Sequence, residues 1–135
     1  MLRALIYLFL FSSFLSCKSS VAKQENDTIL VLQNVLSLSD LAPYLHLDDG
    51  NDSVLRILQN ELIDSDLSFK VEGRKVEFSK LYSRETRFVE VVQLHIEKHN
   101  AQITLRIPYE GVKFVVELNK DNNIWQVKNK SLVEQ

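Results

Sequence analysis

Cysteine, proline and glycine are scarce in this chain, which has one cysteine, two prolines and three glycines among its 135 residues. A single cysteine cannot form an internal disulfide, so the packing of apolar side chains must stabilise the fold. The glycines are too few for loops whose backbone binds phosphate, and the sequence has no paired cysteines and no Ser/His/Asp arrangement typical of hydrolases. We therefore expect no cofactor and no metal, and the sequence favours a non-catalytic protein over an enzyme.

Basic residues do not cluster along the chain. There are 16 Lys and Arg against 18 Asp and Glu, which gives a formal net charge of −2 at pH 7. Domains that bind nucleic acid usually present a concentrated positive surface. We therefore expect no nucleic-acid partner.

A hydrophobic run long enough to span a membrane is also absent. The apolar segment at residues 4–16 has 13 residues, whereas a membrane-spanning helix needs about 20. A short apolar segment that follows a positive charge, here Arg3, is typical of a secretory signal peptide. The sequence therefore predicts export and removal of residues 1–16.

The single cysteine follows this segment directly. The residues Phe14-Leu15-Ser16-Cys17 resemble the lipobox of bacterial lipoproteins. The resemblance implies that Cys17 carries a diacylglyceryl group, that cleavage occurs before it, and that a fatty acyl chain such as palmitate caps the new amino terminus. Several acyl chains attach a protein almost permanently to a membrane. Lys18 replaces the aspartate that retains enterobacterial lipoproteins at the inner membrane, which implies the outer membrane. The alternatives are an ordinary secretory leader with an incidental cysteine and a buried free thiol.

These features divide the chain into three parts. Residues 1–16 are the predicted signal peptide. Residues 17–27 are mostly polar and predict a flexible tether that begins at the lipidated Cys17. Residues 28–135 contain enough apolar side chains for one domain with its own core.

The first half of this domain has helical patterns. Short apolar runs fit a helix or a strand, and we favour a helix for residues 28–37. Helical spacing continues at Leu38, Leu41, Ala42 and Leu45, with Ser39 as the expected N-cap. After a break at residues 48–52, a further helix is predicted over residues 53–63, with Val54, Leu55, Leu58 and Leu62 on one face.

From residue 66 onward the pattern changes to the alternation typical of strands. Phe69 to Phe78 predicts a hairpin that turns near Gly73. Alternating runs over residues 88–97, 101–109, 112–118 and 124–128 are joined by short links, and such links allow only antiparallel pairing. The sequence therefore predicts an antiparallel meander with one apolar and one mostly polar face.

The end of this meander resembles the cystatin-like superfamily, which includes the nuclear-transport-factor-two-like domains. The resemblance lies in the strand Ala101-Gln102-Ile103-Thr104-Leu105, the strand over residues 112–118, and the tryptophan strand Ile124-Trp125-Gln126-Val127. It implies an α+β fold in which N-terminal helices pack on a curved antiparallel meander sheet.

Glu90 is the carboxylate of greatest interest in the predicted sheet. Alternation places it between Phe88 and Val92 on the apolar face, where burial raises the pKa of a carboxyl group. A pocket on the concave face could therefore contain Glu90, together with the aromatic residues Tyr109, Phe114 and Trp125. In the alternative interpretation, Glu90 lies at a strand end or bulge or pairs with Arg84 or Arg87, and the aromatic residues belong to the core.

The three histidines do not predict a metal site. His46 lies close to Asp48 and Asp49, but these residues lack the spacing of a calcium loop and are typical of a tight turn. His95 and His99 are four residues apart on a predicted strand, which separates them by about 13 Å. We expect both to be solvated.

These observations together predict a lipid-anchored protein of the bacterial cell envelope that acts as a non-catalytic binding or interaction module. Its expected partners are the membrane, through the lipid anchor, and another envelope protein. Two alternatives remain open. One is a pocket around Glu90 that binds or transforms a small apolar molecule, and the other is an assembly subunit that adds a strand to a partner through an exposed sheet edge.

Overall fold

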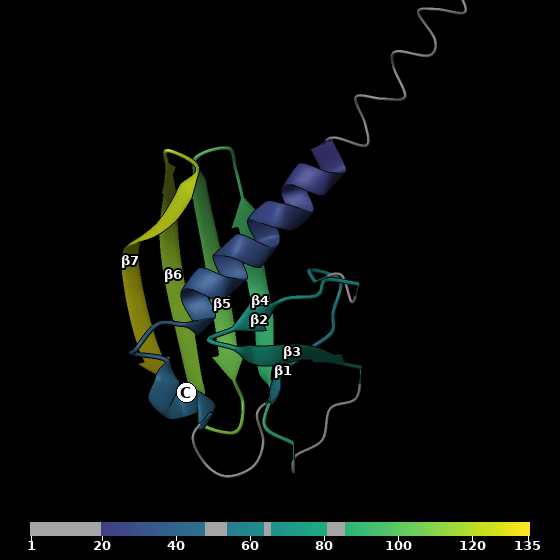
Figure 1. Cartoon of the computed structure of the whole chain (residues 1–135). Helices are drawn as coiled ribbons and strands as arrows, with labels where there is room; N and C mark the ends of the chain where they lie inside the picture. The colour runs from purple at the N-terminus through teal and green to yellow at the C-terminus, as the bar shows by residue number, and fades with distance from the viewer. Residues whose placement is uncertain (1–19, 48–53, 64–65, 81–85) are drawn as a thin grey trace, which may run out of the picture.

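The computed structural model describes residues 20–47, 54–63, 66–80 and 86–135, and it has an α+β architecture with strands dominating. Seven strands form one curled sheet in the order β2-β3-β1-β4-β5-β6-β7 (Figure 1). The strands are β1 (Val54–Leu58), β2 (Lys70–Val71), β3 (Arg74–Ser79), β4 (Val89–Ile96), β5 (Asn100–Ile107), β6 (Val112–Asp121) and β7 (Ile124–Glu134). The predicted leader and Cys17 lie outside the described residues.

An N-terminal helix covers residues 20–36 and lies across one face of the sheet in Figure 1. The helix expected from residue 28 is therefore present. Its buried side chains share one hydrophobic cluster with the strands, and those of Val31, Leu32, Val35 and Leu36 are at most 2% exposed. We call the side of the sheet that faces this helix the inner face.

The tether predicted over residues 17–27 is helical from residue 20 onward, so the prediction of a flexible segment is wrong there. Residues 20–26 are exposed, but they contain the good helix formers alanine, lysine, glutamine and glutamate. Asp27 is buried and accepts a hydrogen bond from the ammonium group of Lys120. This tertiary contact adds to the local helix propensity, which a polar composition alone does not reveal.

The short helix α2 (Ala42–Leu45) follows the N-terminal helix. Helical spacing predicted it, but the N-cap is Leu41 and not Ser39, and no side chain caps it. Pro43 lies in the first turn, where a missing backbone N–H costs little. The helix ends at His46, which has the left-handed backbone conformation common at helix ends (φ 48°).

The helix predicted over residues 53–63 is wrong, because Val54–Leu58 form strand β1. Leu55 and Ile57 point inward and are buried, in the alternation typical of a strand. β1 lies between β3 and β4 in the sheet. Hydrogen bonding to neighbours on both sides therefore overrides a helical spacing of leucines.

The position of β1 also makes the sheet mixed, whereas the sequence predicted a purely antiparallel meander. β1 pairs in parallel with β3 over five residues and with β4 over two. Residues 59–73 lead from β1 to β3, and a longer segment leads to β4. These connections are long enough for parallel pairing, which the short links between later strands do not allow.

The predicted hairpin and the four-stranded meander are confirmed. β2 and β3 pair as antiparallel strands, and Glu72 and Gly73 at their turn both have positive φ angles. Such angles are typical of the two-residue turns that match the twist of a hairpin. β4 to β7 pair in succession as antiparallel strands, and Asn122 and Asn123 form a similar turn between the last two.

The edges of the sheet carry features that hinder pairing with another chain. β2, at one edge, has two residues, whereas β7, at the other edge, has 11. β7 contains the exposed Lys128 and Lys130, and the register between β6 and β7 shifts near Lys128. Lysines and bulges are common protective features of edge strands, whereas an edge strand as long as β7 is what the strand-addition alternative requires. That alternative therefore stays a prediction. Among the described residues, no helix is long and apolar enough to cross a membrane.

The segment that joins the two helices is tied to β7 by an ion pair between Asp40 and Lys130, whose charged atoms are 2.5 Å apart. The hydrogen bond from the Lys130 ammonium lowers the pKa of Asp40 below its ordinary value of 3.8. Because folding lowers this pKa, ionised Asp40 stabilises the native state above pH 3.8, and this contribution is lost as the pH falls through the lowered value.

We expect Lys130→Met to raise the pKa of Asp40 towards 3.8. The measurement is an NMR titration of the carboxyl carbon of Asp40. Lys128→Met is the matched control, because it removes an exposed lysine from the same strand without touching the ion pair. An unchanged titration in the Lys130 variant would show that the ion pair does not form in solution.

Candidate functional site

Glu90 is not on the apolar face of the sheet, contrary to the prediction. The β4·β5 register shifts between Val91 and Gln93, so Val91 and Leu94 both point inward although they are three residues apart. This bulge changes the phase of the alternation. Glu90 therefore lies on the outer face, where it accepts hydrogen bonds from the guanidinium group of Arg106. In the alternative interpretation of the sequence, Glu90 lies at a strand end or bulge or pairs with an arginine. The arginines named there were Arg84, which lies outside the described residues, and Arg87, whereas the observed partner is Arg106.

Phe114 and Trp125, also proposed as pocket residues, belong to the core. Each is 2% exposed and lies in the main hydrophobic cluster. The indole N–H of Trp125 donates to the carboxylate of Asp27 over 3.2 Å, and the Lys120 ammonium lies 5.2 Å from the ring centroid. Neither aromatic residue lines a described pocket next to Glu90.

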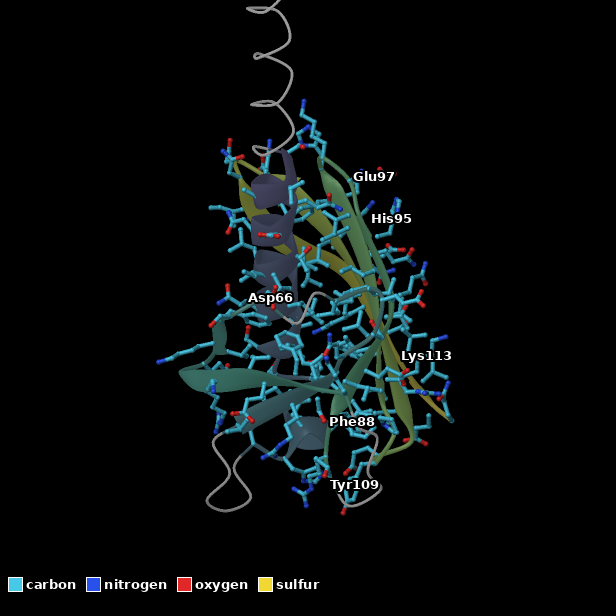
Figure 2. All side chains as sticks on the ribbon, turned by 90° about the vertical axis from the view of Figure 1, so that its right-hand side faces the viewer. Asp66, Phe88, His95, Glu97, Tyr109 and Lys113 are labelled. Atoms are coloured by element: carbon cyan, nitrogen blue, oxygen red, sulfur yellow. The ribbon has the colours of Figure 1, made fainter. Side chains whose placement is uncertain are left out.

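Tyr109 lies at the opposite end of the sheet from Trp125, in the turn between β5 and β6. Figure 2 shows Tyr109 and Phe88 together at the end of the molecule furthest from residue 20. The Arg87 guanidinium lies over the Tyr109 ring, 5.2 Å from its centroid, and the His46 ring meets the same tyrosine edge-on at 6.4 Å. The four residues proposed from the sequence therefore do not form one pocket.

A cavity of about 480 Å³ opens at this end of the molecule, and we call it the seam pocket. Its described lining consists of residues 44–47, residues 54–56, residues 86–89 and Ile107. It arises where β1 and β4 separate, since their parallel register contains only the pairs Ile57–Val89 and Leu58–Glu90. The segments that precede these pairs are not paired with each other, and α2 with the residues that follow it adds residues 44–47 to the lining.

The lining of the seam pocket combines apolar and basic side chains. Leu55, Phe88, Val89 and Ile107 are each at most 7% exposed and form an apolar wall. Arg56 and Arg87 supply guanidinium groups from the two sides of the seam, and Tyr44, His46 and Thr86 add polar groups. Aspartate and glutamate are absent from the described part of the lining.

His46 is oriented by a carboxylate just outside the pocket. Its Nε2 atom is 2.6 Å from Oε1 of Glu110, and the two side chains are 29% and 25% exposed. A carboxylate accepts, so the contact favours the tautomer that carries a proton on Nε2. The left-handed conformation of His46 and this hydrogen bond together fix the ring at the pocket wall.

Three or more metal-ligating side chains do not come together anywhere among the described residues. His95 contacts Glu97 over 3.0 Å, and both are exposed on β4 and its end, where Figure 2 shows them pointing away from the body of the sheet. His99 is exposed as well. Asp48 and Asp49, considered beside His46, lie outside the described residues.

Sequence reasoning did not place Arg56 and Arg87 in a pocket, although both belong to the described lining of the seam pocket. The helix predicted over residues 53–63 contains Arg56, whereas in the structure Arg56 lies on strand β1. The strand-like alternation of Val54-Leu55-Arg56-Ile57-Leu58 is the signal that could have placed Arg56 near the sheet end. The sequence contains no signal for the approach of residues 86–89, because it depends on the parallel pairing with β1.

Comparison of the chain with protein-family models, with curated proteins and with solved structures finds no match.

Proposed function

We propose that this chain is a lipid-anchored binding protein of the bacterial cell envelope, which binds a small ligand in the seam pocket. The anchor is proposed from the sequence, in which the basic residue Arg3 is followed by a short apolar segment and then by Cys17. The identity of Lys18 supports the outer membrane as the destination. Binding without catalysis is the function we assign to the folded domain.

The seam pocket is the observation that carries the binding function. Sites for small molecules are usually concave, mostly apolar and 300–1,000 Å³ in volume, with a few polar groups that fix the orientation of the ligand. The seam pocket has a volume of about 480 Å³, and its described lining contains an apolar wall together with basic and hydroxyl-bearing side chains. This pocket replaces the one proposed around Glu90, which faces outward and pairs with Arg106.

We also propose that the fold is a variant of the cystatin-like architecture. Two features support this relationship: a long N-terminal helix that shares a hydrophobic cluster with the sheet, and four successive antiparallel strands that end in the tryptophan strand β7. The strands β1, β2 and β3 then form an extension on one side of the meander. The seam pocket lies at the junction between this extension and β4.

Val54→Trp tests the binding function, because it places a large side chain in the pocket lining at a partly exposed position. We expect this variant to weaken binding of 2-naphthol, an apolar probe with one hydroxyl group, at least about tenfold. The measurement is calorimetric titration of the lipidated protein in phosphatidylcholine nanodiscs, with empty nanodiscs as the reference.

Val133→Trp is the matched control, since it introduces the same side chain at an exposed position of β7. The control should bind 2-naphthol as the wild type does. Equal binding by all three proteins, or no binding by the wild type, would contradict the assignment of the seam pocket as a binding site.

A further inference from the structure

We propose that the edge strand β7 is an interface between two copies of this chain, in which residues 130–134 of each copy pair as antiparallel strands about a two-fold axis at Leu132. The partner is therefore a second copy of the chain, and the contact continues the sheet from one copy into the other. This inference goes beyond the proposed binding in the seam pocket and does not depend on it. It follows from the open backbone groups of β7, the order of its side chains and the exposure of Val133.

One side of β7 has backbone groups that the sheet does not use. β7 is the last strand of the sheet, as Figure 1 shows. At the end of its ladder with β6, the N–H of Gln135 donates to the carbonyl of Gly111 over 2.7 Å. Alternate residues of an antiparallel strand direct their backbone groups to the same side. Residues 131 and 133 therefore face β6, and residues 130, 132 and 134 direct their backbone groups away from the sheet.

Two further observations agree with this orientation. The backbone N–H of Lys130 donates to the side-chain oxygen of Asn129 over 2.9 Å, so it does not take part in the ladder with β6. In the part of the chain that the structure describes, nothing forms a hydrogen bond with the outward backbone groups of Leu132 and Glu134. These groups are therefore able to bond to a strand of another molecule.

The side chains of the three outward residues follow an order that is complementary to itself. Lys130, Leu132 and Glu134 point to the inner face, because their partners on β6 are the buried residues Val116, Phe114 and Val112. A two-fold axis at Leu132 brings the two leucines together and places Lys130 opposite Glu134 of the partner subunit. Opposite charges at directly paired positions stabilise a sheet. A two-fold dimer requires a self-complementary surface of this kind.

Both charged groups are accessible for this pairing. Glu134 is exposed, and its carboxylate has no ion pair or hydrogen bond within the described ranges. Lys130 already pairs with Asp40, but its side chain is 40% exposed and an ammonium group has three N–H donors. An axis at Lys130 would instead place two ammonium groups opposite each other, and like charges in that position destabilise a sheet. The charges therefore favour the axis at Leu132.

Val133 supplies apolar surface to the same interface. It is one of the exposed large hydrophobic residues, with 51% of its surface accessible. Around an axis at Leu132, the two Val133 residues are diagonal neighbours across the new pair of strands, at about 7 Å. Leu132 is partly buried and packs against the core. Pairing therefore removes apolar surface of both residues from water on both faces of the sheet.

The features of β7 that hinder pairing mostly precede this segment. Lys128 is exposed at the register shift between β6 and β7, whereas the register is regular from Asn129 to Glu134. The pairing segment is short, and a contact of this size is typical of weak or transient association. Attachment of both copies to one membrane would raise their effective concentration.

The experiment measures the mass of the full chain by sedimentation equilibrium in a detergent solution of matched density. The wild type should be in a monomer–dimer equilibrium with a Kd of about 0.1 mM or below. Glu134→Lys replaces both attractive pairs by pairs of lysines and should raise the Kd at least about tenfold. Lys130→Glu replaces them by pairs of carboxylates and should raise the Kd to a similar extent.

An equimolar mixture of the two variants tests the register of the pairing. In a mixed dimer, each lysine at positions 130 and 134 lies opposite a glutamate, so the repulsion of both variants is relieved. The mixture should therefore form heterodimers with a Kd close to that of the wild type, although each variant alone stays largely monomeric. This recovery also shows that Lys130→Glu, which loses the ion pair with Asp40, is folded.

Glu117→Lys is the matched control, because it makes the same change of charge at an exposed position of β6, a strand paired on both sides. It should leave the Kd of the wild type unchanged. A monomeric wild type at about 1 mM, wild-type dimerisation of Glu134→Lys, or no recovery in the mixture would overturn the inference. None of these results bears on binding in the seam pocket, whose described lining contains no residue of β7.

Discussion

Replacement of Asp27 by alanine is expected to lower the free energy of unfolding by about 3–5 kcal/mol, because it leaves a buried ammonium group without its partner. Oδ1 of Asp27 is 2.5 Å from Nζ of Lys120 and 3.2 Å from Nε1 of Trp125. The side chains of the ion pair are only 12% and 10% exposed, so water replaces the lost contacts poorly. The loss is a large fraction of the 5–15 kcal/mol that stabilises a typical domain.

Chemical denaturation followed by the fluorescence of Trp125, the single tryptophan, measures this change. Asp121→Ala is the matched control, because Asp121 is the exposed residue next to Lys120 at the end of β6. We expect a change of less than about 0.5 kcal/mol for the control. Similar stabilities of the two variants would show that the Asp27 cluster does not form in solution.

A double variant separates the ion pair from simple loss of packing. Asp27→Leu combined with Lys120→Met removes both charges and keeps apolar volume at both positions. Replacing a buried pair by apolar side chains is often nearly neutral, so the double variant should recover most of the stability that Asp27→Ala loses. The Trp125 N–H still lacks its acceptor, which keeps the recovery incomplete by about 1–3 kcal/mol. Additive losses from the two single variants would contradict a coupled pair.

The same cluster explains why the N-terminal boundary of the fold was predicted too late. Residues 20–27 are mostly polar, and this composition predicts a tether. In the structure, however, Asp27 joins the helix to β6 through Lys120 and to β7 through Trp125. The partners are separated from Asp27 by more than 90 positions in the chain. A composition-based prediction has no access to such a contact, whereas the apolar residues from Val31 to Leu36 were sufficient to predict the helix itself.

The strands after residue 66 were predictable because alternation and turn residues are local signals. The hairpin at Gly73 and the meander from β4 to β7 follow directly from them. The bulge near Val92 is also local in structure, but no glycine or proline marks it in the sequence. One unmarked extra residue was therefore enough to place Glu90 on the wrong face.

The seam pocket could not be predicted, because its lining comes from four separate parts of the chain. Its existence depends on the parallel approach of β1 to β4, which is limited to two residue pairs. Parallel neighbours that are distant in sequence have no turn between them to reveal the pairing. The chemistry of the site thus depends on topology, although each of its residues is ordinary when considered alone.

Replacement of Cys17 by alanine is expected to abolish lipid attachment completely, because alanine has no thiol to receive the diacylglyceryl group that the lipobox resemblance implies. Each buried CH₂ of an acyl chain contributes about 0.8 kcal/mol to membrane binding, and several chains make it almost irreversible. The apolar segment at positions 4–16, with 13 residues, is too short to replace this anchor by spanning the bilayer. The variant should therefore retain residues 1–16 and carry no fatty acyl chains.

Mass spectrometry of the intact protein isolated from native membranes, with and without globomycin, measures both changes. Globomycin, which blocks the peptidase that cleaves lipoproteins, should leave the wild-type chain with its leader attached. Ser16→Ala is the matched control, since it keeps a small residue before the cysteine and should be processed and acylated as the wild type is. An unmodified Cys17 in the wild-type protein, or normal cleavage of the alanine variant, would refute the lipid anchor. Either outcome would leave the proposed binding in the seam pocket open to its own test, because the described lining of that pocket lies within the folded domain.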